Sequence, residues 1–208
     1  MLHRALWDSC RDLAEDCLTH PFVRGLAQGT LDPAVFRDYV AQDAFYLRAF
    51  MKSYALALAR CDEPGAAQAF HELIGGVLQE MAMHREYART LGVKLAAARP
   101  NAACLAYTDF LLATAWGRTL GEILAAMTPC MRLYAWLGQN LARQATPENP
   151  YRRWIETYGA AEFDQLAARI ESLLDAYATD SPEIRDAYRY AMECELRFFS
   201  AVMPALTV

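Results

Sequence analysis

The sequence predicts an all-α protein of seven or eight helices. Apolar residues recur at intervals of three and four along most of the 208-residue chain, which is the spacing of one helix face. No run alternates polar and apolar residues as a strand does, and no repeat of about 20 to 50 residues is visible. The length suits one domain with a full core, so residues 1–208 are expected to form a single helical domain.

Prolines delimit the first helices. The first helix is expected over residues 3–19, because the residue before a proline, here His20, avoids the helical conformation. A turn or short helix follows. Asp32 and Pro33 then supply an N-cap and a first-turn proline for a helix that reaches about Arg60. The buried side of this second helix is expected to hold Phe36, Tyr39, Asp43, Tyr46, Leu47, Phe50 and Tyr54.

Six further segments show helical periodicity. Gly92 is expected to close the third helix as a C-terminal cap, and a linker over residues 146–150 separates two later helices. The expected helices cover residues 66–91, 101–116, 119–145, a short segment that ends at Gly159, 162–178 and 181–203.

Charge and composition argue against a nucleic-acid or membrane partner. The net charge is -5, and the 20 basic residues are spread singly rather than gathered in a stripe. No apolar stretch approaches the roughly 18 residues of a bilayer span, and Asp8 lies where a signal peptide needs an apolar core. We therefore expect a cytoplasmic protein. Its six cysteines form no CxxC pair and show no metal-ligand spacing, so they are expected to be reduced and free of metal.

Three polar residues interrupt apolar helix faces: Asp43, Cys130 and Glu195. Cys130 is in phase with Ile123, Met127, Tyr134 and Leu137, and Glu195 is in phase with Tyr188, Met192, Phe199 and Val202. Burying a carboxylate without partners costs several kcal/mol. Any one of these residues could be a satisfied core group, but their convergence on one core favours a functional pocket.

The residue types in this predicted pocket suggest covalent chemistry. A thiolate can add to an electron-poor ring carbon, and a glutamic acid whose pKa is raised by burial can protonate a leaving group and then activate water. Pro129 is expected to kink the helix just before Cys130, because it lacks an N–H and crowds the preceding turn. Four phenols can donate to the carboxylates and line a slot for a flat ring: Tyr46, Tyr107, Tyr134 and Tyr158.

Five blocks of the chain resemble the TenA, or thiaminase II, family. They are HPFVRGLAQGTLDPAVFRDYVAQDAFYL (20–47), AYTDFL (106–111), TPCMRLY (128–134), WIETY (154–158) and ELRFF (195–199). The blocks follow the family's order and are spread over almost the whole chain, from residue 20 to residue 199. Single blocks such as WIETY are weak signals, whereas the first and third blocks together are specific. The cysteine places the resemblance in the cysteine-type branch of the family.

The resemblance implies a heme-oxygenase-like helical bundle, usually a homotetramer, that hydrolyses aminopyrimidines in thiamin salvage without a cofactor. The implied substrate is 4-amino-5-aminomethyl-2-methylpyrimidine, which loses ammonia to become the hydroxymethyl pyrimidine; many members also cleave thiamin. By matching position, Cys130 is the nucleophile, Asp43 holds the amino and ring-nitrogen side of the pyrimidine, and Glu195 is the acid/base at the leaving group. Tyr107 and Tyr158 match hydrogen-bonding tyrosines. Tyr46 and Tyr134 match the aromatic walls.

Two other functions remain open from the residues alone. His84 follows Glu80 by four positions, a spacing that can place both on one metal, as in a di-iron oxygenase of the same fold. The expected second cluster of an acid and a histidine is missing near Asp186 or Glu195, so His84 is interpreted as a core histidine. A heme oxygenase belongs to the same alternative. A protein that binds a pyrimidine without turnover is the other.

Overall fold

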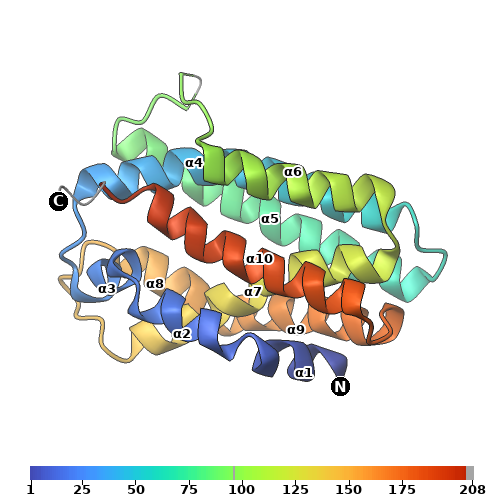
Figure 1. The fold of residues 1–208 in the computed structure, drawn as a ribbon. Helices are drawn as coiled ribbons and strands as arrows, with labels where there is room; N and C mark the ends of the chain where they lie inside the picture. The colour runs from blue at the N-terminus through green and yellow to red at the C-terminus, as the bar shows by residue number, and fades with distance from the viewer. Residues whose placement is uncertain (96, 205–208) are drawn as a thin grey trace.

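The computed structural model describes residues 1–95 and 97–204, and over these residues the chain is entirely helical apart from its turns and loops. Figure 1 shows the helices as one bundle. Their bounds are α1 Leu2–Ser9, α2 Arg11–Thr19, α3 Pro21–Gln28, α4 Pro33–Leu58, α5 Pro64–Thr90, α6 Ala102–Gly117, α7 Leu120–Ala142, α8 Arg152–Gly159, α9 Ala161–Tyr177 and α10 Pro182–Ala201.

The all-α prediction is confirmed, but the described residues form ten helices rather than seven or eight. The predicted first helix is two helices, because Cys10 leaves the helical conformation with φ -113° and ψ 19°. The break lets α1 lie against α9 while α2 lies against α10. The segment after it, expected as a turn or short helix, is α3, which ends at Gly29 in the left-handed conformation that glycine adopts readily.

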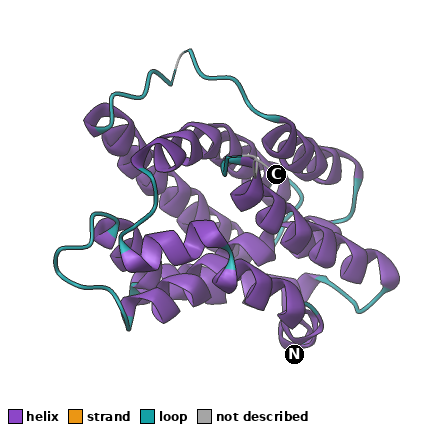
Figure 2. Ribbon diagram, turned by 60° about the vertical axis from the view of Figure 1, so that its left-hand side comes forward, coloured by secondary structure: helices purple, strands orange, loops and turns teal. Residues whose placement is uncertain are grey.

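The helix α7 lies at the centre of the bundle. It contacts α8, α9 and α10 extensively and also touches α4 and α6. Figure 1 shows α4, α5 and α6 on one side of the bundle and α1, α2 and α9 on the other, with α10 crossing between them; Figure 2 shows the same bundle turned by 60°. Every residue from Ile123 to Met131 is buried, as expected for a helix that is apolar on all sides. Cys130 therefore lies within a continuous buried stretch of α7.

Local contacts fix where α7 begins and how it faces its neighbours. Thr119 and Glu122 form a capping box, in which the Glu122 side chain accepts from the Thr119 backbone N–H at 3.0 Å. The helix continues through Pro129 to Ala142. Arg132, two residues after Cys130, donates to both Glu171 oxygens of α9 at 2.6 and 2.7 Å, which fixes α7 against α9.

The helices α7 and α8 meet through two glycines. A Cβ atom on Gly138 would lie 2.3 Å from the backbone nitrogen of Gly159 and 2.4 Å from the carbonyl carbon of Tyr158. Only a residue without a side chain permits this approach. The contact brings the Tyr158 ring to 4.8 Å from the ring of Tyr134, which lies one turn before Gly138 on α7.

No helix in the described part of the chain combines the length and the apolarity that a membrane crossing requires.

Candidate active site

The three polar residues predicted to face inward are buried on three different helices. Asp43 on α4 has 3% of its surface exposed, Cys130 on α7 has 9% and Glu195 on α10 has 2%. Their surroundings form two groups of side chains that are joined by hydrogen bonds and close polar contacts. One group connects Glu195 to phenols beside Cys130, and the other connects Asp43 to α5 and α8.

The first group is built around Glu195. The Tyr107 hydroxyl donates to Glu195 Oε1 at 2.8 Å, and the Tyr46 hydroxyl donates to the Tyr107 oxygen at 3.4 Å. The Tyr46 and Tyr107 rings lie 4.8 Å apart between centroids. The predicted residues Tyr46, Tyr107, Cys130 and Glu195 thus lie together, on α4, α6, α7 and α10.

Burial shifts the pKa values of both Glu195 and Cys130. Desolvation raises the pKa of Glu195 to about 7, although hydrogen bonds with Tyr107 and Cys130 act to lower it. Desolvation, and next the nearby charge of Glu195, raise the pKa of Cys130 well above its usual value, while a hydrogen bond from Tyr46 acts to lower it. At neutral pH the sulfur is therefore a thiol, and the half-ionised Glu195 beside it can accept the thiol proton.

The second group links Asp43 to Glu80 through two other side chains. Asp43 Oδ2 lies 3.2 Å from His84 Nδ1, and His84 Nε2 lies 3.4 Å from the Tyr158 hydroxyl oxygen. The Tyr158 hydroxyl donates to Glu80 Oε1. Asp43 Oδ2 and His84 Nδ1 have no other hydrogen-bond partner, and their mutual contact is not aligned as a hydrogen bond.

The ionisable members of the second group are all shifted toward their neutral forms. Desolvation, and then the charges of Glu80 and Glu195, raise the pKa of Asp43 well above its usual value. Desolvation raises the pKa of Glu80 to about 7, opposed by the hydrogen bond from Tyr158. Desolvation lowers the pKa of His84 to about 3, so this imidazole is neutral at physiological pH.

Aromatic rings surround both groups. The Tyr39 hydroxyl donates to the Tyr134 oxygen at 3.4 Å and receives the Trp154 indole N–H at 3.3 Å. Tyr134 also lies 5.9 Å from Phe199 between ring centroids. Tyr134 and Tyr158 are buried, as predicted. Flat, apolar walls with phenol oxygens suit a flat heterocycle that carries amino groups.

Gln42, the residue before Asp43, positions α6 rather than the reacting groups. Its side chain donates to the Arg99 carbonyl at 3.1 Å and accepts from the Asn101 backbone N–H at 2.8 Å. Asn101 in turn caps α6 by accepting from the Cys104 N–H at 2.8 Å. This connection fixes the start of α6 beside α4 and so holds Tyr107 over Glu195.

One group of side chains in the described residues has the composition of a metal site. Ligand atoms of Asp43, Glu80 and His84 all lie within 4.8 Å of one another. A di-iron centre requires a second set of ligands, and the described residues contain no second group of this kind. Because Glu80 and His84 already contact the Tyr158 hydroxyl, we treat the three as a proton-sharing group.

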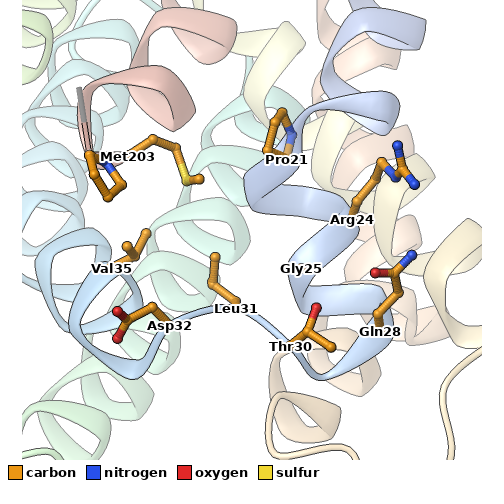
Figure 3. A pocket seen from close by; sticks show the side chains of 10 residues that line it. Pro21, Arg24, Gly25, Gln28, Thr30, Leu31, Asp32, Val35 and Met203 are labelled. Atoms are coloured by element: carbon orange, nitrogen blue, oxygen red, sulfur yellow. The ribbon is translucent and has the colours of Figure 1, made fainter. Parts of the chain in front are cut away.

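Two surface pockets differ in their relation to this site. Figure 3 shows a pocket of about 350 Å³ where α3, the start of α4 and the end of α10 meet, lined by Arg24, Gln28 and Asp32 among others. Its lining includes none of the predicted site residues. A second pocket, of about 270 Å³, lies between α5, α8 and α9, and its wall includes Glu80. The Phe163 ring in this wall packs edge-on against the ring of Tyr158 at 5.0 Å.

The sequence predicted that Asp43, Cys130 and Glu195 face inward but did not predict several of the side chains that contact them. Tyr39 and Trp154 complete the aromatic wall, and His84 with Glu80 completes the Asp43 group. The four-residue spacing of Glu80 and His84 was the available signal. This spacing placed Glu80 and His84 on one face of a helix. It did not indicate that Asp43 and Tyr158, from two other helices, lie against that face.

The chain is similar in sequence to several known proteins. The sequence pattern of the TENA/THI-4/PQQC family matches residues 7–205. The chain is 34% identical to the "Aminopyrimidine aminohydrolase" of Bacillus subtilis, over 85% of this chain and 78% of that protein. It is 33% identical to the mitochondrial "Bifunctional TH2 protein" of Arabidopsis thaliana, over 87% of this chain and 34% of that protein. The chain thus spans about a third of the length of that relative.

The fold of the chain is also found in solved structures. A "TenA family transcription regulator" from Silicibacter superposes with a TM-score of 0.90 at 28% identity, over 97% of this chain and 96% of that one. A domain from Shewanella denitrificans, described as having a heme oxygenase-like fold, superposes with a TM-score of 0.67 at 14% identity, over 96% of this chain and 90% of that one. The second likeness concerns the fold alone and confirms the predicted bundle.

Proposed function

Because the chain belongs to the TENA/THI-4/PQQC family, we propose that it is an aminopyrimidine aminohydrolase of thiamin salvage. The proposed reaction converts 4-amino-5-aminomethyl-2-methylpyrimidine and water to the 5-hydroxymethyl pyrimidine and ammonia, and thiamin is a second candidate substrate. The observation that carries the proposal is the Glu195 carboxyl held by Tyr107 beside the buried thiol of Cys130. The name of the Bacillus relative supports the same reaction.

In the proposed first step Cys130 acts as the nucleophile. Burial keeps the thiol protonated, so the carboxylate of Glu195 takes its proton as the sulfur adds to an electron-poor ring carbon. The ring nitrogen that receives the electron pair takes a proton from Asp43, whose pKa is raised so that it begins as an acid.

In the proposed later steps Glu195 passes protons at the leaving group. It donates the former thiol proton to the amine, the exocyclic C–N bond breaks, and ammonia leaves. Water then adds to the exocyclic carbon while Glu195 accepts one of its protons. Expulsion of the sulfur restores the aromatic ring, the ring-nitrogen proton returns to Asp43, and Glu195 returns a proton to Cys130.

The phenols are proposed to hold the ring during these steps. Tyr46 and Tyr134 lie on different helices, α4 and α7, and would wall the pyrimidine. Tyr107 and Tyr158 would accept hydrogen bonds from amino groups of the substrate, because each has its one hydroxyl proton engaged with a carboxyl group of the site. A pocket that binds the pyrimidine without turnover is the competing function, and a di-iron or heme oxygenase of the same fold is a further one.

An ammonia-release assay tests the proposal. Wild-type protein is given the aminomethyl pyrimidine, and separately thiamin, beside the variant Cys130→Ser. We expect wild-type turnover and a loss of about a thousand-fold or more in Cys130→Ser, because the sulfur forms the covalent bond. Binding of the pyrimidine, measured by calorimetry, should persist in the variant because the thiol serves chemistry more than docking.

Cys61→Ser is the matched control. Cys61 is also a free cysteine, but it lies in the turn after α4, outside the site. Its replacement should leave ammonia release unchanged. Wild-type protein that binds the pyrimidine but releases no ammonia would support the binding function instead, and visible absorption from iron or heme would support an oxygenase.

We further propose that the protein is cytoplasmic and assembles as a homotetramer of one TenA-like domain per chain. All six cysteines are free, which a reducing compartment maintains and which the thiol chemistry requires. Exposed Trp116 and Leu105 at 71% and 45% offer apolar surface on α6 for contact between subunits. Sedimentation equilibrium of the purified chain measures the assembly directly.

A further inference from the structure

We propose that Glu80 is a positioning residue that takes over the negative charge of Asp43 during the reaction, through proton shifts across Tyr158 and His84. The inference rests on the proposed function, in which Asp43 gives a proton to the ring. Glu80 does not touch the ring in this scheme. It acts through three contacts that join α5, α8 and α4 in a continuous line.

The line of contacts is unbroken from Glu80 to Asp43. Tyr158 is hydrogen-bonded to Glu80 Oε1, and its oxygen lies 3.4 Å from His84 Nε2. The opposite ring nitrogen, His84 Nδ1, lies 3.2 Å from Asp43 Oδ2. These last two atoms are buried and lack any other partner, so a proton placed between them satisfies both.

The group has two proton arrangements of equal total charge. In one, Glu80 is protonated and donates to Tyr158, Tyr158 donates to His84 Nε2, and His84 Nδ1–H faces an ionised Asp43. In the other, Asp43 donates to His84 Nδ1, His84 Nε2–H faces Tyr158, and Tyr158 donates to an ionised Glu80. Three proton shifts convert the first arrangement into the second. Each shift breaks one O–H or N–H bond and forms another, so no outside acid or base is consumed.

The direction of this shift follows from where each carboxyl group lies. When Asp43 gives a proton to the ring, it is left as an anion with only 3% of its surface exposed. Glu80 is only partly buried and lines the pocket of about 270 Å³ between α5, α8 and α9. Moving the charge from Asp43 to Glu80 carries it to the side of the site that water can solvate, which lowers its desolvation cost.

No basic group competes for the displaced charge among the titratable side chains that influence this line from the other elements. Those side chains are Tyr39 and Tyr54 of α4, Cys104 of α6, Cys130 and Tyr134 of α7, Glu195 of α10, and Glu162 of α9, which lines the pocket beside Glu80. The pKa of Glu80, raised to about 7, supports its beginning the cycle protonated.

The test compares Glu80→Gln with Glu162→Gln in the ammonia-release assay. The glutamine side chain retains the size and one acceptor oxygen of Glu80 but cannot release a proton. We expect kcat of Glu80→Gln to fall by about ten-fold or more with KM within about three-fold, because only the charged intermediate loses support. Wild-type kcat should decline as pH rises through about 7, where Glu80 ionises, and this decline should be absent in Glu80→Gln.

Glu162 lines the same pocket but contacts neither Tyr158 nor His84 in the hydrogen-bonded group, so Glu162→Gln should match the wild type in kcat and in pH profile. A second variant, Tyr158→Phe, breaks the line while keeping Glu80, and it should also abolish the decline above pH 7. Glu80→Gln behaving as Glu162→Gln does, with full kcat and the decline intact, overturns the inference.

A second readout separates this inference from the proposed reaction. Carbon-13 NMR of the carboxyl groups follows Asp43 and Glu80 without turnover. Titration of the two is coupled in the wild type, and a coupling that weakens in Tyr158→Phe to what direct repulsion between the carboxyl groups leaves supports the line of contacts, even in a protein that releases no ammonia. Independent titration of the two carboxyl groups in the wild type overturns it, whether or not the protein is an aminohydrolase.

Discussion

The hydroxyl group of Tyr107 limits how far burial raises the pKa of Glu195. Desolvation raises its pKa, and the hydrogen bond from Tyr107 at 2.8 Å is the largest opposing influence. In the proposed mechanism the reaction begins with Glu195 ionised, so the acid side of the pH–rate profile reports this pKa. The phenol therefore sets the lowest pH at which the thiol can be deprotonated.

The variant Tyr107→Phe should move that acid limb to higher pH. Removing the hydroxyl leaves the Glu195 carboxylate without its donor, which favours the protonated form and raises the pKa. We expect activity at about pH 6 to fall by about ten-fold relative to the wild type, with this difference shrinking as the pH rises. The measurement is kcat/KM for ammonia release across pH.

Tyr190→Phe provides the comparison. Tyr190 also lies beside α6, where its ring contacts Phe110 at 4.7 Å between centroids, but it is outside the Glu195 group. The pH profile of kcat/KM in Tyr190→Phe should match that of the wild type. An unshifted acid limb in Tyr107→Phe would show that a group other than Glu195 governs it.

For single residues, the sequence predicted which side chains are buried better than it predicted which side chains they contact. The helical phase of Asp43, Cys130 and Glu195 was sufficient to predict their burial. The link between Tyr158 and Glu80 spans 78 positions, and no periodicity within one helix reports which residue faces it from another.

At the scale of elements, the contact of Gly138 with Gly159 holds the site together. Gly138→Ala places a methyl group 2.3 Å from a backbone nitrogen that cannot rotate away, so α8 must shift. We expect the melting temperature to fall by several degrees, consistent with overpacking costs of about 1 to 3 kcal/mol. Turnover should fall as well, because the shift moves Tyr158. Thermal unfolding and ammonia release measure the two effects.

Gly75→Ala is the matched control for that substitution. Gly75 lies inside α5, and a Cβ atom there meets nothing within 4 Å. Alanine should stabilise the helix there by up to about 1 kcal/mol. Equal melting temperatures for the two variants would contradict the close approach of α7 and α8.

Helix boundaries were predictable where a cap or proline marks them. Asp32 and Pro33 begin α4, and Asn101 caps α6, both at the expected positions. The division of the first segment at Cys10 was not predictable, because no glycine or proline marks it. There, the packing of α1 on α9 and of α2 on α10 decides the conformation, and this is a tertiary effect.

For the whole molecule, burying acids makes stability depend on pH. Glu195 has a pKa of about 7 in the folded protein against a usual 4.5, so folding is favoured most when this group is protonated. Its contribution is complete below about pH 4.5 and is lost as the pH rises to about 7. His84 acts in the opposite sense, because its pKa of about 3 removes stability as the pH falls below 6.5.

The variant Glu195→Gln isolates the carboxyl contribution, because His84 is the same in both proteins. Glutamine stays neutral at both pH values. On going from about pH 5 to about pH 8, the free energy of unfolding of the variant should therefore rise relative to that of the wild type by on the order of 2 kcal/mol. Urea unfolding at the two pH values measures the difference. Glu193→Gln, which removes an exposed partner of Arg197 on the same helix, should show no such pH-dependent gain.

The backbone contact between α7 and α8 also restricts how a substrate can enter. The backbones of α7 and α8 touch there without intervening side chains, so we expect these two helices to move together and to carry both the sulfur and the Tyr158 wall. Because Asp43, Cys130 and Glu195 are all buried, we expect a ring to be admitted only when helices packed against that unit, such as α4 or α10, move away from it. The helices that open the site would then carry its acid residues with them. Each closure would bring these residues back into contact with the bound ring.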